Sequence, residues 1–257
     1  MTRIVTLANQ KGGVGKTTTA INLGASLAAC ERRVLLVDLD PQANATSGLG
    51  LSKHDERSMY PVLVDQMAIR DIIRSTEIST LFIAPSSVDL VGAELELGGA
   101  EEREYRLRQA LASITSEYDY ILIDSPPSLG LLTINALTAA DSVLVPMQCE
   151  YFAIEGVAQL LNTIERVREA LNPSLEIEGI ALTMFDERMN LSRQVAEEVR
   201  GHFGEKVYGT VVPRNVRLGE APSFGKPIIL YDIRSRGSEA YVNLAREFIA
   251  RAEHVLQ

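Results

Sequence analysis

The chain has 257 residues, of which 46% are hydrophobic and 23% are charged, and its formal net charge is −9. This composition supplies a large buried core and excludes an intrinsically disordered chain. The acidic balance excludes a protein that coats nucleic acid through its overall charge, although a local basic patch can still bind DNA. The length suits one sheet of an α/β fold, so we expect a single domain over residues 1–257.

The cysteines and the hydropathy pattern indicate the cellular location. Cys30 and Cys149 lie far apart, without the spacing of a disulfide framework or a zinc site. The first residues enter a strand pattern at once, without the charged and apolar regions of a signal peptide. No segment has the ~20 consecutive apolar residues of a membrane-spanning helix. We therefore expect a cytoplasmic protein and no membrane partner.

Short apolar segments alternate with amphipathic segments along the chain. The expected strands are residues 4–8, 34–39, 81–84, 120–123, 142–147, 179–183 and 210–212. The expected helices are residues 17–29, 103–116, 156–170 and 192–203, and residues 51–99 are the least regular part. Because the strands are apolar throughout and are separated by helices, we predict an α/β fold with one doubly wound, mostly parallel, twisted sheet flanked by helices. Ligands of such sheets bind beyond the carboxyl ends of the strands.

The last segment, residues 238–257, has apolar residues at helical spacing, among them Tyr241, Leu244 and Phe248. Such a helix either lies on a membrane surface or packs on the protein core. Its arginines are balanced by glutamates, and it lacks a lysine-rich polar face. We therefore expect it to pack on the core.

A glycine-rich segment, Gly12-Gly13-Val14-Gly15-Lys16-Thr17, follows the first expected strand and precedes the first expected helix. This context is that of a phosphate-binding loop. In such a loop, glycines let main-chain N–H groups surround phosphate oxygens at the positive end of the helix. We expect Lys16 to contact the β- and γ-phosphates and the Thr17 hydroxyl to ligate Mg²⁺. ATP and Mg²⁺ are thus the expected cofactors.

Two apolar strands lead into aspartates. Alternation along an extended chain would place Asp38 and Asp40 on the same side, where one carboxylate can position an attacking water. Asp124 follows residues 120–123 and precedes a loop stiffened by two prolines. Its carboxylate is suited to hold Mg²⁺ through a water. A strand that ends in aspartate also occurs without function, so these assignments depend on the phosphate loop.

Several motifs occur together in this chain. The longer ones are Lys11-Gly12-Gly13-Val14-Gly15-Lys16-Thr17-Thr18, Val37-Asp38-Leu39-Asp40-Pro41-Gln42, Asp124-Ser125-Pro126-Pro127 and Val212-Pro213-Arg214-Asn215-Val216-Arg217. The shorter ones are Asn9-Gln10, Asn44-Ala45-Thr46, Glu150-Tyr151, Glu220-Ala221-Pro222-Ser223 and Gly225-Lys226-Pro227. In combination they resemble the ParA/Soj family of chromosome and plasmid partitioning ATPases, which have a deviant Walker A loop and belong to the MinD/ParA superfamily. The resemblance is weakest between residues 52 and 118.

The resemblance implies roles for individual residues. Lys11 would reach across a nucleotide-sandwich homodimer to the phosphates of the other subunit, which couples ATP binding to association. Gly12 would lie at the dimer seam, where a side chain would obstruct the approach. Lys11, Lys16 and Asp40 would be catalytic, Asp40 by orienting or activating water, and Asp124 would support the metal with Thr17. The implied nucleotide-binding residues are Lys11, Gly12, Gly13, Val14, Gly15, Lys16, Thr17 and Thr18, together with Pro213 and Asn215 at the adenine base.

Dimers of this family bind double-stranded DNA without sequence preference, which requires contacts from arginine and lysine to phosphates. Residues 212–237 carry a local basic excess within this acidic chain. The candidates for DNA contact are Arg188, Arg217, Lys226, Arg234 and Arg236, of which Arg188 and Arg217 match family positions for that contact. The resemblance further implies slow hydrolysis, stimulation by a ParB-type centromere-binding protein, and association with the nucleoid.

Other functions stay open at this level. A membrane-binding division-site ATPase of the MinD branch would need a basic amphipathic tail. A metabolic ligase, or a reductase of the nitrogenase iron protein type, would need a substrate pocket or bridging cysteines. A purely structural role would leave Asp40 and Asp124 idle. Residues 1–3 precede the first strand, so operator-specific binding is not expected, and Arg3 is the only basic residue ahead of that strand. The cargo, chromosome or plasmid, stays open.

Overall fold

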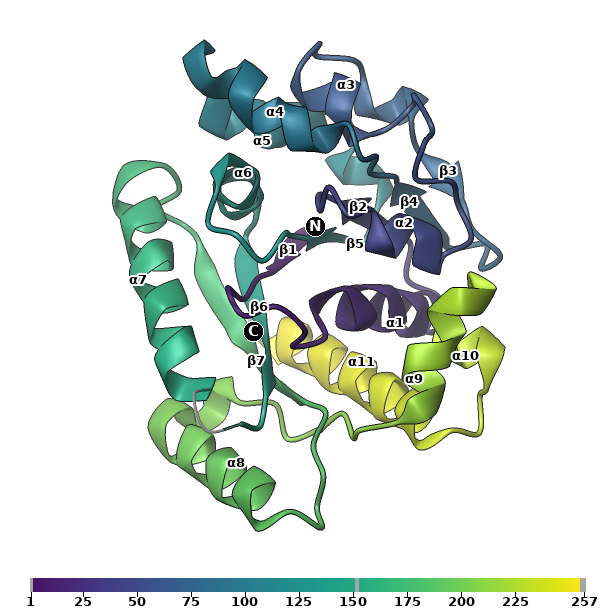
Figure 1. Ribbon diagram of the computed structural model, residues 1–257, viewed down its shortest axis with the longest axis vertical. Coiled ribbons are helices and arrows are strands. Elements are labelled where there is room, and N and C mark those ends of the chain that lie inside the picture. Colours follow the sequence, from purple (N-terminus) through teal and green to yellow (C-terminus); the bar gives the residue numbers. More distant parts are fainter. Residues whose placement is uncertain (1, 151–152, 255–257) are drawn as a thin grey trace.

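The computed structural model describes residues 2–150 and 153–254 (Figure 1). The strands are β1 (Arg3–Leu7), β2 (Val34–Asp38), β3 (Arg74–Ser75), β4 (Leu81–Ala84), β5 (Tyr120–Asp124), β6 (Ser142–Gln148) and β7 (Glu176–Thr183). The α-helices are α1 (Lys16–Ala29), α2 (Asn44–Gly48), α3 (Met59–Leu63), α4 (Leu90–Glu96), α5 (Arg106–Ala112), α6 (Leu131–Ala139), α7 (Ala153–Ala170), α8 (Asn190–Phe203), α9 (Val216–Glu220), α10 (Ile228–Tyr231) and α11 (Arg236–His254). Single 3-10 turns are Ile69–Asp71, Leu97–Gly99, Arg103–Tyr105, Thr115–Glu117, Gly204–Lys206 and Ala221–Phe224.

Within the described residues, the strands form one sheet in the order β3-β4-β2-β5-β1-β6-β7. Neighbouring strands are parallel, except that β3 pairs antiparallel with β4 at one edge. The predicted doubly wound, mostly parallel sheet is confirmed. The parallel register brings the carboxyl ends of β1, β2 and β5 together, with Asp124 paired to Leu7 on one side and to Asp38 on the other.

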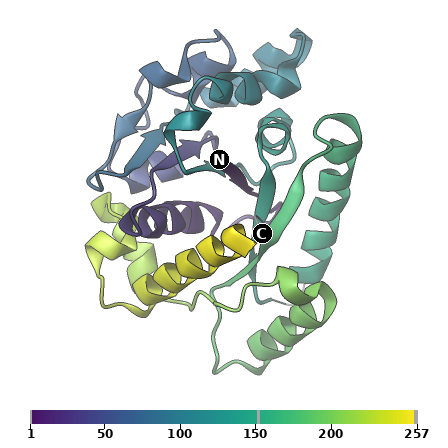
Figure 2. The same ribbon diagram turned by 180° about the vertical axis from the view of Figure 1, so that it is seen from behind.

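Helices cover both faces of the sheet. On β2, Leu36 packs into the cluster that contains α1 and α11, whereas Leu35 and Val37 pack into the cluster that contains α3 to α6. Figures 1 and 2 show α1 and α11 on one side of the sheet and α6 and α7 on the other. Because neither side of the central strands faces solvent, their sequences are apolar throughout.

The last helix packs on the core, as predicted. In α11, Tyr241, Leu244 and Phe248 are buried against the cluster around α1, and the Tyr241 hydroxyl lies 3.0 Å from Thr19 Oγ1. The apolar face of residues 236–254 is thus used inside the fold, while residues 255–257 of the expected helix lie outside the described residues. None of the described helices is both long enough and apolar enough to span a membrane.

Two expected elements are wrong in detail. Residues 210–212 do not form a strand, since Val212 alone bonds to the backbone around β7, donating to Leu182 and accepting from Phe185, while the Thr210 amide donates to the Glu247 side chain. Residues 103–116 do not form one helix, since α5 starts only at Arg106. Around residue 103, side-chain hydrogen bonds replace those of a regular helix, since Asn135 of α6 accepts from the Leu107 amide and donates to the Arg103 carbonyl.

Arg3 also differs from expectation. It is the first residue of β1, and its guanidinium pairs with the buried Glu178 carboxylate at 2.6 Å. Glu178 in turn accepts hydrogen bonds from Ser142 and Tyr208. The interpretation of Arg3 as a basic residue ahead of the first strand is therefore wrong, because Arg3 belongs to β1 and its side chain pairs with Glu178 of β7.

Candidate functional site

The phosphate loop connects β1 to α1 at the carboxyl edge of the sheet. Gly13 and Gly15 have φ angles of 76° and 85°, a left-handed conformation that glycine adopts without strain. The loop is held from outside, since the Thr183 hydroxyl donates to the Val14 carbonyl at 2.8 Å and Asn9 Nδ2 donates to a β6 carbonyl at 2.8 Å. The loop backbone is therefore preformed, with its amides at the start of α1.

Lys16 is the first residue of α1 and is only 7% exposed. Burial lowers the pKa of its ammonium group from the usual value, and the nearby carboxylates of Asp124 and Asp40 counter part of that effect. Its Nζ lies 3.5 Å from the Lys11 carbonyl oxygen. A buried cation at this place is electrostatically costly unless anions approach it, which a phosphate would do.

Asp38 and Asp40 have different surroundings. The Asp38 carboxylate is fully buried and accepts hydrogen bonds from the Thr46 amide at 2.8 Å and the Thr46 hydroxyl at 2.7 Å. Burial raises the pKa of Asp38 to about 6. Because β2 ends at Asp38, Asp40 lies in the following loop, where its Oδ1 accepts from the Gln42 amide and its carbonyl accepts from the Ser86 hydroxyl. Asp38 anchors α2, which leaves Asp40 as the candidate for contact with a reacting water.

Asp124 ends β5 and is fully buried, and neither of its carboxylate oxygens makes a hydrogen bond within the described residues. Burial, followed by the charge of Asp38, raises the pKa of Asp124 well above its usual range, and the nearby Thr17 hydroxyl and Lys16 ammonium counter part of that rise. Such a carboxylate needs a cation or a hydrogen-bond donor. The described residues hold no cluster of three acidic, histidine or cysteine ligands. The oxygen donors of Thr17 and Asp124 fit Mg²⁺, which binds through few protein groups and keeps waters and phosphate oxygens.

Replacing Asp124 by asparagine is expected to raise the melting temperature of the nucleotide-free protein at pH 8 and to remove the stabilisation by Mg²⁺ with ATP. A carboxyl group whose pKa is raised by folding costs no stability below its unfolded value of ~4, and costs progressively more as pH rises above it. The gain should be about 1–3 kcal/mol at pH 8 and should vanish near pH 4. Thermal unfolding at the two pH values, with and without Mg²⁺ and ATP, measures this.

The matched control is Asp65→Asn, because Asp65 is exposed. It should leave the melting temperature unchanged at both pH values and keep the stabilisation by Mg²⁺ with ATP. A destabilised Asp124→Asn variant would contradict the description of Asp124 as an uncompensated buried carboxylate.

A pocket of about 200 Å³ joins the phosphate loop to the late loop before α9. Gly15 and Thr18 line one side of it, and Pro213 and Asn215 line the other, so the fold brings these predicted nucleotide residues together across the sequence. Sequence reasoning did not assign the other wall residues to the nucleotide; these are Thr183, Met184, Val212, Arg214, Leu218, Gly219 and Tyr241. Met184 has a φ of 50°, which is rare for a side chain of this type. The signal that could have drawn attention to Thr183 and Met184 is their position at the carboxyl end of β7.

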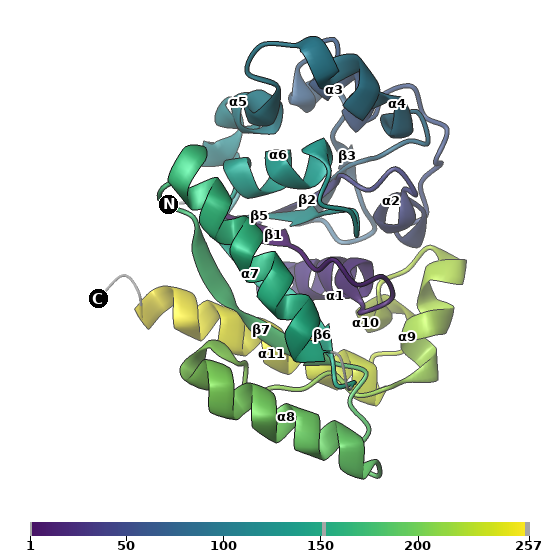
Figure 3. The same ribbon diagram turned by 60° about the vertical axis from the view of Figure 1, so that its left-hand side comes forward.

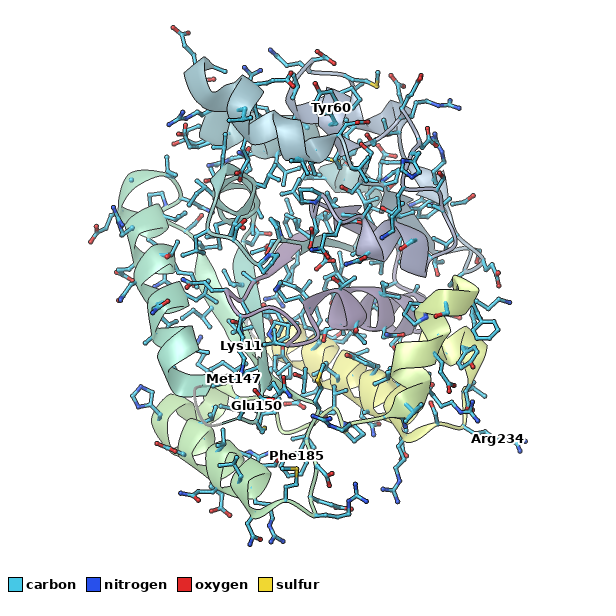
Figure 4. All side chains as sticks on the ribbon, in the orientation of Figure 1. Lys11, Tyr60, Met147, Glu150, Phe185 and Arg234 are labelled. Atoms are coloured by element: carbon cyan, nitrogen blue, oxygen red, sulfur yellow. The ribbon has the colours of Figure 1, made fainter. Side chains whose placement is uncertain are left out.

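Lys11 and Gly12 lie at the outer part of the loop. The Lys11 ammonium pairs with Glu150 at 2.6 Å, and the two side chains are 40% and 45% exposed (Figure 4). Tyr151, the other residue of that motif, lies outside the described residues. A Cβ atom added to Gly12 would meet no atom within 4 Å, and its φ lies outside the left-handed region. The fold of the single chain therefore gives no reason for glycine at this position.

The basic residues predicted to contact DNA lie in two regions. Arg188 and Arg236 line an open depression with a volume of about 770 Å³, which Arg214 also lines. The Arg188 guanidinium is held by Asp186 through two hydrogen bonds of 2.9 Å, and this lowers the pKa of Asp186 to about 2.

The remaining three lie near α9 and α10. Arg217 pairs with Glu220 at 2.8 Å and with Asp232 at 3.6 Å. Arg234 projects from the body of the molecule in Figure 4. Lys226 instead pairs with Glu77, in the segment between β3 and β4, at 3.3 Å. Arg188 and Arg236 thus share one depression, whereas Arg217, Arg234 and Lys226 lie near α9 and α10.

A preformed loop at the start of a buried helix, a buried lysine and aspartates at adjacent strand ends define a P-loop nucleotide-binding protein. The AAA domain family matches residues 2–177. The chain is 59% identical over 251 residues to the sporulation initiation inhibitor protein Soj of Bacillus subtilis, covering 97% of this chain and 99% of that protein. It is 58% identical over 250 residues to the chromosome partitioning protein ParA of Myxococcus xanthus, covering 97% of this chain and 88% of that protein.

The chain belongs to the ParA/Soj family of partitioning ATPases. Among solved structures, cobyrinic acid a,c-diamide synthase from Mycobacterium smegmatis, with bound ATP analog and magnesium, has a TM-score of 0.87 to this chain at 38% identity, over 98% of this chain and 96% of that one. The relatives named for partitioning are thus considerably more similar in sequence than this metabolic enzyme. The predicted family is confirmed.

Proposed function

We propose that this chain is an ATP-timed switch that segregates chromosome or plasmid DNA. Binding of ATP with Mg²⁺ closes a homodimer, the dimer holds double-stranded DNA without sequence preference, and slow hydrolysis stimulated by a ParB-type partner releases it. The chain would act in the cytoplasm, associated with the nucleoid. The observation that carries the proposal is the exposed pair Lys11 and Gly12 at the outer part of the phosphate loop.

In the proposed reaction, the chain's own groups bind the triphosphate, hold its charge and orient water. The loop amides and the Lys16 ammonium surround the β- and γ-phosphate oxygens, where negative charge moves during cleavage. Thr17 and Asp124 would hold Mg²⁺, which when bound neutralises phosphate charge. Asp40 accepts a hydrogen bond from the attacking water and directs its oxygen toward the γ-phosphorus. Pro213 and Asn215 hold the adenine base in the 200 Å³ pocket.

Dimer formation explains the two residues that the single chain leaves unexplained. Lys16 already provides a cation for the phosphates bound by its own loop, whereas Lys11 is directed to the surface and held by Glu150. An ATP-bearing partner surface offers Lys11 a multiply charged anion in place of one carboxylate, which favours association when ATP is present. Because Gly12 has no side chain, the phosphate loops of the two subunits can approach each other closely.

Replacing Gly12 by valine is expected to leave the folded chain intact and to abolish ATP-dependent dimerisation. Open space at Gly12 should hold the change in unfolding free energy within ~0.5 kcal/mol, since nothing in the chain must move. Sedimentation velocity with ATP and Mg²⁺ measures the association. The control is Gly201→Val on α8, another glycine with no atom within 4 Å of an added Cβ, which should dimerise as the wild type does. Dimerisation of Gly12→Val would remove the main support for the proposal.

Replacing Arg188 or Arg217 by alanine is expected to weaken DNA retention by the ATP-bound protein about tenfold for each residue at low salt. Loss of one phosphate contact should lower affinity equally for unrelated sequences and reduce the salt slope by about 1. Fluorescence anisotropy with two unrelated duplexes over a salt series measures both quantities. Arg70→Ala is the control, since Arg70 is another exposed arginine paired with a glutamate, Glu117. Variants of Arg188 and Arg217 that match Arg70→Ala would show that DNA binds elsewhere.

A further inference from the structure

Helix α4 has an apolar face in solvent. Val88, in the turn before α4, and Val91 and Leu95, on the helix, are 42%, 67% and 85% exposed. Their spacing of three and four residues places them in one stripe, because the Val91 amide already donates to the Val88 carbonyl. The opposite face of α4 is anchored by Leu90 and Ala93, which are fully buried among α3, α5 and α6. The stripe is therefore a second apolar face on a helix that already has its core contacts, and exposed apolar patches of this kind mark interaction sites.

Carboxylates surround the stripe. On the helix, Asp89 and Glu96 flank it on one side and Glu94 on the other, by the 100° rotation per residue. Residues 88–104 contain one arginine, Arg103, and six acidic residues, which are Asp89, Glu94, Glu96, Glu101, Glu102 and Glu104. Asp89, Glu94 and Glu96 thus give the apolar stripe an acidic rim, and Lys53, whose carbonyl accepts a hydrogen bond from the Val88 amide, lies beside its first residue.

This charge distribution selects one kind of occupant. DNA and anionic membranes are repelled by a carboxylate rim. A second copy of this chain, seated by the same face across a two-fold axis, would oppose the acidic residues to themselves. A basic amphipathic segment has the complementary pattern, with apolar residues for the stripe and lysines or arginines for the rim.

The stripe is also connected to the nucleotide site. The Glu94 carboxylate accepts a hydrogen bond from the Leu132 amide at the start of α6 at 3.3 Å, and a Cβ atom on Gly130 would overlap it. Residues 125–130 are the loop between Asp124 and α6. Figure 3 shows α4 with α3 and α5 at the end of the molecule above α6. An occupant of α4 would therefore lie beside the segment that leads from Asp124.

We propose that the α4 surface, formed by Val88, Val91 and Leu95 with its acidic rim, is a docking site for a basic amphipathic segment of a partner protein. The apolar stripe provides the buried contact and the carboxylates provide orientation and selectivity. The link from this site to ATP hydrolysis, through Glu94 and the loop after Asp124, rests on the proposed function. The docking site itself stands on the exposure and charge of α4 alone.

The test uses the full chain and a fluorescent synthetic peptide with leucines at helical spacing and lysines at the remaining positions. Anisotropy gives its Kd with ATP and Mg²⁺ and with ADP, at low and moderate salt. Binding should weaken about tenfold in the double variant Val91→Asn with Leu95→Asn. The matched control is Ile233→Asn, since Ile233 is also an apolar side chain with 67% exposure. A peptide with serines in place of the leucines should bind more weakly to the wild type.

The outcomes separate this inference from the proposed function. Loss of peptide binding in the α4 variant, with binding kept in Ile233→Asn, would support it. Equal binding by all three proteins, or no binding by the wild type, would overturn it. It would also be overturned if sedimentation showed that the α4 variant fails to dimerise with ATP, because a second copy would then cover the stripe. ATP turnover and DNA retention of the wild type, measured in the same preparation, report on the proposed function independently.

Discussion

Replacing Lys11 by alanine is expected to abolish ATP-dependent dimerisation and to lower ATP turnover by about 10²–10³-fold, while ATP binding by the single chain remains. Lys16 and the loop amides still hold the phosphates in the variant, so the first binding step keeps its contacts. What is lost is the surface cation that offsets the phosphate charge of the other subunit. Sedimentation velocity, a fluorescent ATP analogue and a phosphate-release assay measure the three quantities.

The companion variant for Lys11 is Glu150→Gln. It breaks the same intramolecular ion pair, which spans 2.6 Å, but leaves the lysine in place. If the pair served only to stabilise the fold, both variants would behave alike. If Lys11 acts on the other subunit, Glu150→Gln should dimerise as well as the wild type or more readily, because its lysine is no longer held. Parallel behaviour of the two variants would refute the intermolecular role.

Replacing Asp40 by alanine is expected to reduce ATP hydrolysis by about 10²–10⁴-fold, the usual contribution of a positioned acid or base. Dimerisation and DNA retention with ATP should persist and should last longer, since the switch can no longer reset. Asp40 lies in the loop after β2, where its Oδ1 accepts from the Gln42 amide and its main-chain carbonyl accepts from the Ser86 hydroxyl. Its carboxylate is therefore buried and held in place, but it anchors no other helix or strand.

Three measurements on the Asp40 variant check this expectation. Phosphate release, sedimentation with ATP, and the off-rate from DNA should show slow hydrolysis combined with a stable dimer. Asp65→Ala, at an exposed aspartate, is the control and should behave as the wild type in all three. A variant that loses dimerisation together with hydrolysis would mean that Asp40 supports the nucleotide-bound structure and does not serve the water.

Long elements were predictable from sequence because their signal is local. β2 and β5 are continuous apolar runs, and α1 and α8 have a full helical period over many residues. Short elements were not predictable, since α2, α9 and α10 have only four or five residues each and hardly complete one turn. They exist because tertiary contacts hold them, as Asp38 does for α2 through Thr46.

The candidate site divides in the same way. The sequence by itself determined the phosphate loop and the family, because a loop of fixed residues between a strand and a helix is a local pattern. Only the tertiary structure decided that Asp38 anchors α2, which leaves Asp40 as the candidate for contact with water, and that Pro213 and Asn215 face Gly15 across one pocket. The tertiary structure also showed that Val88, Val91 and Leu95 form an exposed apolar stripe with acidic residues beside it. These features depend on which side chains the sheet order and burial bring together, and no short window of sequence contains that information.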